Sequence, residues 1–74
     1  MKKPYMNKGG DSNIEFYEEF HDHIIIWFRG TSKKYSWSAS KVGNHHIQVM
    51  RGLANQGKGL NNYIKLHVQN DYDA

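Results

Sequence analysis

The sequence contains no cysteine and a single proline, and its hydrophobic runs are all short. Without cysteine, neither a disulfide nor a thiolate zinc site can stabilise the fold. No apolar stretch approaches the roughly 20 residues that a membrane span requires, and no apolar segment follows the basic start as it would in a secretion signal. We therefore expect a small cytoplasmic protein that side-chain packing alone holds together.

Acidic residues are missing from the long span between His23 and Asn70. The lysines and arginines of that span are Arg29, Lys33, Lys34, Lys41, Arg51, Lys58 and Lys65. Their positive field attracts polyanions, although a run of charge is often only a solvated surface. The missing carboxylates also leave no group to orient a serine–histidine pair. We expect a protein that is not an enzyme.

Five histidines are the remaining candidates for metal ligands. His21 and His23 are spaced to share one face of a strand, and His45 and His46 are adjacent. Without cysteine, a metal would need histidines from separate elements together with a carboxylate such as Asp22. We expect neither a metal nor another cofactor.

Aromatic and β-branched residues, which are plentiful, predict three strands. The first covers residues 14–18, and the second covers residues 23–29. The second strand is apolar on both faces, which is typical of the central strand of a sheet. In the third strand, residues 33–38, Tyr35 and Trp37 share one face because strand side chains alternate.

Helical periodicity begins directly after the third strand. A helix is predicted from about Ser40 to Asn55, because one stripe of residues recurs at helical spacing. The stripe consists of Val42, His46, Val49, Met50 and Leu53, and Ile47 and Ala54 widen it. Gly57 and Gly59 end it. Residues 61–68 alternate in polarity and are compatible with a final strand or with a short helix.

These elements predict an α+β fold. We expect a small antiparallel sheet of three to four strands, connected as a meander, with one helix packed on one face. Residues 1–11 are expected to form a flexible basic N-terminal tail, residues 12–69 a single domain, and residues 70–74 a C-terminal tail.

Several short motifs follow one another in a particular order along residues 12–65. They are Ser12-Asn13-Ile14, an apolar strand ending at Phe28, Gly30, Tyr35-Ser36-Trp37, and then Gly57, Leu60, Asn61 and Ile64. In this order and spacing the chain resembles the KTSC domain, a module found alone in bacterial and phage proteins and at the C-terminus of some lysyl-tRNA synthetases. Trp37 stands where that family has a second tyrosine. The resemblance implies a binding domain, and an RNA-binding role has been proposed for the family.

Two functions of different classes are compatible with this sequence. The first is non-catalytic nucleic-acid binding, with RNA favoured over DNA, through Arg29, Lys33, Lys34, Lys41, Arg51 and Lys58. Tyr35 and Trp37 either stack bases in that function or belong to the core beneath the helix. The second is a protein-interaction or regulatory module in which Ile25 and Trp27 contact a partner or a second copy of the chain. An open aromatic face among lysines favours nucleic acid, and one without a basic rim favours protein.

Overall fold

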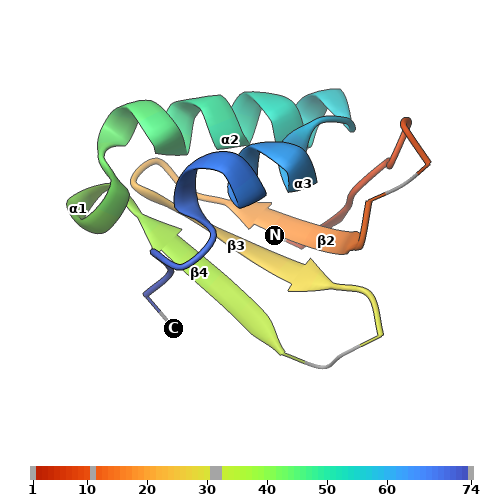
Figure 1. Ribbon diagram of the computed structural model, residues 1–74, viewed down its shortest axis with the longest axis horizontal. Helices are drawn as coiled ribbons and strands as arrows, with labels where there is room; N and C mark the ends of the chain where they lie inside the picture. Colours follow the sequence, from red (N-terminus) through yellow and green to blue (C-terminus); the bar gives the residue numbers. More distant parts are fainter. Residues whose placement is uncertain (1, 11, 31–32, 74) are drawn as a thin grey trace.

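The computed structural model describes residues 2–10, 12–30 and 33–73, which form an antiparallel sheet covered on one face by helical segments (Figure 1). The strands are β1 (Lys3–Pro4), β2 (Ile14–Glu19), β3 (His23–Phe28) and β4 (Lys34–Ser38). The helical segments are α1 (Ala39–Val42), α2 (Asn44–Gln56), α3 (Leu60–Tyr63) and the π-helical η1 (Ile64–Val68). The strand order is β1-β2-β3-β4, so every strand pairs with its neighbours in sequence. The predicted α+β meander is confirmed.

The centre of the sheet is β3, as its apolar residues on both faces predict. Ile24 and Ile26 are fully buried on the face beneath the helical segments. Trp37 of β4 lies opposite Ile24 and is 1% exposed. Its indole N–H donates a hydrogen bond of 2.8 Å to the carbonyl oxygen of Val68, so the polar atom of this large ring is satisfied inside the core.

The helical layer differs from the single helix expected over about Ser40 to Asn55. Gly43, at φ +95°, separates α1 from α2, a conformation that glycine adopts without strain. This break makes α1 and α2 two separate helices. The buried residues of α2 are Ile47, Met50 and Ala54, while Val42, Val49 and Leu53 are only partly buried at the margins of the core.

Residues 61–68, for which the sequence left a strand and a helix open, are helical. Gly57 caps α2 in the left-handed conformation, and its N–H donates to the carbonyl oxygen of Leu53. The chain then turns into α3 and η1, where Leu60, Ile64 and Val68 are buried. This spacing of four residues places all three side chains on one helical face, against the sheet.

The first residues of the expected N-terminal tail take part in the fold. Lys3–Pro4 pairs with β2 as strand β1. Tyr5 is 5% exposed, and its hydroxyl accepts a hydrogen bond from the backbone N–H of Leu60. The N–H of Lys8 donates to the carbonyl oxygen of Gly57. A buried aromatic ring therefore anchors a segment whose composition predicted a loose tail. Outside the described residues lie Met1, Asp11 and Ala74, which the expected tails include.

A bulge in β2 decides which side chains reach the face without helices. Ile14 is the register partner of Phe28, and Phe16 is the partner of Trp27, so Glu15 is an extra residue. One extra residue reverses the alternation of the side chains. Ile14 is therefore buried in the core, whereas Phe16 lies beside Trp27 on the opposite face.

Candidate nucleic-acid interface

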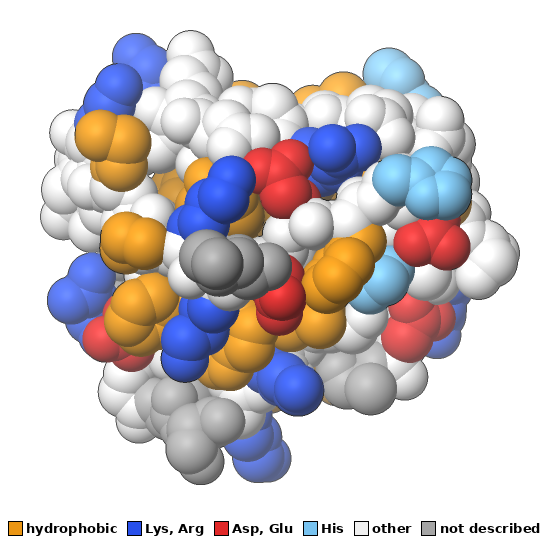
Figure 2. All heavy atoms as spheres, turned by 180° about the vertical axis from the view of Figure 1, so that it is seen from behind, with side chains coloured by type: hydrophobic (Ala, Val, Ile, Leu, Met, Phe, Trp, Pro, Cys, Tyr) orange, Lys and Arg blue, Asp and Glu red, His pale blue; other side chains and the backbone are white. Residues whose placement is uncertain are grey.

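The sheet face without helices carries one aromatic row that crosses every strand. The row consists of Pro4, Phe16, Trp27 and Lys34, each the register partner of the next. Register partners on neighbouring strands have Cβ atoms about 5 Å apart, so the rings of Phe16 and Trp27 lie side by side. Both rings are partly exposed. Figure 2, which views the molecule from the side opposite to that of Figure 1, shows hydrophobic side chains among lysine and arginine side chains, with acidic side chains between some of them.

Two lysines lie over the rings of this row. The Nζ atom of Lys2 is 4.6 Å from the ring centroid of Phe16 and 5.0 Å from that of Trp27. The Nζ atom of Lys34 is 5.9 Å from the ring of Trp27. At exposed positions such a cation–π contact stabilises by only about 0.5–1 kcal/mol. The row therefore combines aromatic surface with two cations that are weakly held.

The neighbouring row on the same face is more polar. It consists of Glu18, Ile25 and Ser36, again as register partners. Ile25 and Trp27, the predicted protein-contact residues, therefore lie on one open face in successive rows. Phe16, which the sequence did not single out, completes the aromatic surface because of the bulge.

The structure brings together some of the predicted basic residues and separates others. Arg29, Lys33 and Lys34 lie around the connection between β3 and β4, at the end of the sheet where Trp27 is found. Lys41 lies in α1, and its ammonium donates to the carbonyl oxygen of Tyr72. Lys58 lies between α2 and α3. These last two belong to other parts of the surface than the aromatic row.

Arg51 is held in an ion pair. Its Nε–H donates over 3.1 Å to one carboxylate oxygen of Glu19, and the ammonium of Lys3 lies 3.3 Å from the other. Partial burial raises the pKa of Glu19, but hydrogen bonds from Arg51, Asn55 and Lys3 outweigh that effect, and the pKa lies below its usual value. Glu19 therefore satisfies Arg51, which connects α2 to the sheet.

Tyr35 and Trp37 lie on the helix side of the sheet. Trp37 is a core residue. Tyr35 is half-buried, with its ring edge-on to Phe28 at 5.6 Å and to Tyr72 at 4.8 Å between centroids. Neither ring shares a surface with Trp27, so any base stacking on the open sheet face would use Phe16 and Trp27 instead.

The histidines make local contacts with their neighbours. His23 lies 2.8 Å from the carboxylate of Asp22, a hydrogen bond that lowers the pKa of Asp22, and its ring stacks on Phe20. The Nδ1 atom of His46 lies 2.5 Å from the hydroxyl of Tyr63, whose pKa is raised by burial. Among the residues that the structure describes, no three histidines, cysteines or acids are placed to hold a metal ion.

No protein-family model matches the sequence, and no curated protein or solved structure matches it either. The resemblance to the KTSC domain therefore remains a prediction. In the described part of the chain, no helix has the length and apolar character that crossing a bilayer demands. The function is consequently inferred from the surface of the molecule itself.

Proposed function

We propose that the protein binds single-stranded nucleic acid on the open face of its sheet, without catalysing a reaction. The observation that carries this proposal is the cross-strand pair of Phe16 and Trp27 beneath the ammonium of Lys2. Exposed aromatic rings on strands stack unpaired bases, and neighbouring cations contact the phosphates. The preference for RNA over DNA rests on the resemblance to the KTSC domain alone.

The ammonium of Lys2 covers the ring faces in the free protein, so a base must displace it. Losing an exposed cation–π contact costs about 0.5–1 kcal/mol, whereas stacking a base on an aromatic side chain stabilises by about 1–3 kcal/mol. The exchange is favourable. The displaced ammonium remains attached beside the rings, where it can contact the phosphate that accompanies the base.

The same two lysines weigh against a protein partner on this face. A protein interface would remove the ammoniums of Lys2 and Lys34 from water, and lysine is depleted at such interfaces for this reason. The adjoining row adds only Ile25 as an apolar side chain, beside Glu18 and Ser36. A polyanion, in contrast, benefits from both cations.

The proposal is tested by fluorescence anisotropy of labelled RNA and DNA oligomers of the same sequence at low salt. Phe16→Ala and Trp27→Ala should each weaken RNA binding about fivefold to a hundredfold, the loss of one stacked base. Ile25→Ala is the matched control, because this residue lies on the same face without a ring, and affinity should stay unchanged. Undetectable binding by the unmodified protein would contradict the proposal. An equal loss in Ile25→Ala would point to a general apolar contact.

A further inference from the structure

A second surface lies on the helix side of the sheet, where two cavities adjoin. The larger has a volume of about 390 Å³ and lies between the β3–β4 hairpin, η1 and the C-terminal segment. The smaller has a volume of about 160 Å³ and lies between the N-terminal segment and α3. Asn61 and Lys65 line both. The two cavities therefore adjoin at these side chains, and we refer to them together as the cleft.

The floor of the larger cavity is aromatic. Tyr35 contacts Phe28 and Tyr72 edge-on, with centroid distances of 5.6 and 4.8 Å. Tyr72 belongs to the C-terminal segment, which is fixed beside β4 by a hydrogen bond from the N–H of Asp73 to the carbonyl oxygen of Ser36. Three separate parts of the chain thus combine to present a preformed aromatic surface, which suits a flat ring.

The rim of the larger cavity is made of primary amides. They belong to Asn13, Asn61, Gln69 and Asn70. Within the described residues, none of these amide groups makes a hydrogen bond to another part of the protein. Each amide offers a donor and an acceptor side by side, the pattern with which asparagine and glutamine recognise the edge of a base.

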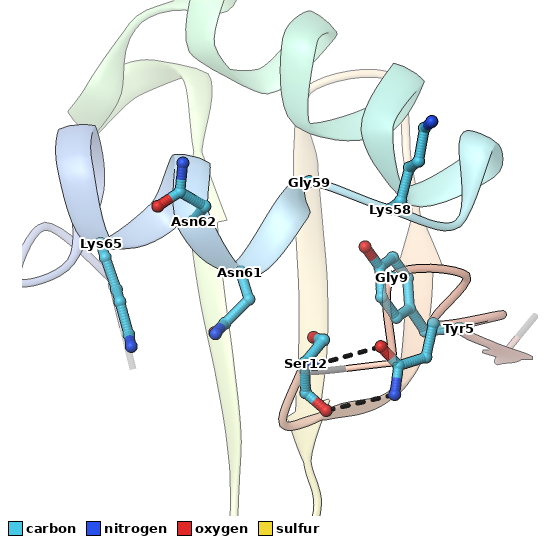
Figure 3. A pocket seen from close by; sticks show the side chains of 9 residues that line it. Tyr5, Gly9, Ser12, Lys58, Gly59, Asn61, Asn62 and Lys65 are labelled. Atoms are coloured by element: carbon cyan, nitrogen blue, oxygen red, sulfur yellow. Dashed lines mark hydrogen bonds between the residues drawn. The ribbon is translucent and has the colours of Figure 1, made fainter.

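The charge of the cleft is positive. Its described lining contains no aspartate or glutamate. In Figure 3, Lys65 and Asn61 extend from the helical segment in the same direction, as residues four apart do, whereas Lys58 and Asn62 point the other way. Lys65 lines both cavities, whereas Lys58 lines only the smaller one, so Lys65 is the cation that an anionic group bound in the larger cavity would meet.

We infer that the cleft binds a nucleoside monophosphate, either free or as the terminal nucleotide of a strand. The base would lie against Tyr35 and Phe28, its edge would meet the rim amides, and the phosphate would contact Lys65. The volume of the larger cavity falls within the range of small-molecule sites. A neutral sugar carries no anionic group that Lys65 could contact, and inorganic phosphate has no ring that could lie against the aromatic floor. The cleft lies across the sheet from Phe16 and Trp27, so this inference does not rest on the proposed function.

The experiment is a ¹H–¹⁵N NMR titration of the whole protein with each of the four ribonucleoside monophosphates up to about 10 mM, a range that detects millimolar dissociation constants. The side-chain amide signals of Asn61 and Asn70 should shift. Adenosine should bind about tenfold more weakly than AMP, because it lacks the phosphate that Lys65 contacts, and inorganic phosphate should leave the amide signals in place. Oligomers with and without a terminal phosphate distinguish a strand end from a free nucleotide as the source.

Matched variants locate the site. Lys65→Ala should weaken AMP binding about tenfold while leaving adenosine binding unchanged, and Asn61→Ala should weaken both about threefold. Lys34→Ala and Gln48→Ala are the controls, because neither residue lines either cavity, and they should bind as the unmodified protein does. Trp27→Ala should retain AMP binding. The inference is wrong if no monophosphate shifts the amides, if inorganic phosphate shifts them equally, or if the control variants lose as much affinity as Lys65→Ala.

Discussion

The indole N–H of Trp37 donates to the carbonyl oxygen of Val68 over 2.8 Å, and this bond joins β4 to the π-helical η1. Both residues are 1% exposed. The same carbonyl oxygen also accepts a hydrogen bond of 3.0 Å from the backbone N–H of Asp71. The aromatic ring and the end of the helical layer therefore stabilise each other.

Replacing this ring should destabilise the fold. Trp37→Phe removes one of the two hydrogen bonds to the Val68 carbonyl oxygen and opens a small cavity, so the free energy of unfolding should fall by about 1–3 kcal/mol. Urea denaturation followed by circular dichroism measures the change. Trp27→Phe is the control, since Trp27 lies half-buried on the open face. A Trp27→Phe effect as large as that of Trp37→Phe would contradict the core assignment.

Two glycines of the helical region should respond to alanine with opposite signs. Gly57 has φ +85°, and a Cβ there would lie 2.8 Å from the Cβ of Met6. Gly57→Ala should therefore lower stability by at least about 1–2 kcal/mol, the usual cost of a left-handed residue with a side chain. Gly52 lies inside α2 with nothing within 4 Å of such a Cβ. Gly52→Ala should raise stability by about 0.5–1 kcal/mol.

Thermal unfolding of the two variants side by side checks this prediction. Both variants replace a glycine of the helical region by alanine, so the added methyl group is the same in each, and a difference in stability between them reflects the local backbone and its surroundings. Stabilisation by Gly57→Ala would show that the N-terminal segment does not lie against the end of α2.

How far the sequence predicts this structure depends on the range of the interactions involved. The strand β3 and the shared face of Tyr35 and Trp37 follow from local alternation and from composition. The side on which Phe16 lies does not, because the bulge at Glu15 is supported by a long-range bond, from the N–H of Tyr5 to the Glu15 carbonyl oxygen. Likewise, the position of Lys2 over the rings depends on the pairing of β1, which two residues cannot specify locally.

Periodicity also has a limit in the helical layer. The predicted stripe ran through Val42, Val49 and Leu53 as well as Met50, whereas the fully buried residues of α2 are Ile47, Met50 and Ala54. For the sites, the prediction that Tyr35 and Trp37 share one face of the sheet is correct, but local alternation does not tell how deeply each ring is buried. The sequence grouped Tyr35 with Trp37 as one pair, and only Trp37 is fully buried.

The stabilisation that Glu19 provides should be present at neutral pH and lost at acid pH. Its pKa is lowered in the folded protein, so its contribution is present above the unfolded value of about 4.3 and is lost as pH falls through the folded pKa. Glu19→Gln should therefore melt below the unmodified protein at pH 7, and the difference should shrink as the pH is lowered below about 4. Melting temperatures between neutral and acid pH test this. A difference that stays constant with pH would show that the Glu19 charge does not stabilise the fold.

The salt dependence of nucleic-acid affinity distinguishes the contribution of the lysines on the open face from that of the aromatic rings. Each phosphate contact on a single strand contributes about −0.7 to the slope of log affinity against log salt concentration. The double variant Lys2→Ala with Lys34→Ala should therefore flatten the slope for RNA by about 1.4. Phe16→Ala and Trp27→Ala should lower affinity at every salt concentration and leave the slope unchanged, because the rings carry no charge. Lys41→Ala, in α1, is the control for a lysine outside the row. If the double variant keeps the full slope, the phosphates contact other cations, and Arg29 and Lys33 at the neighbouring hairpin end become the next residues to replace.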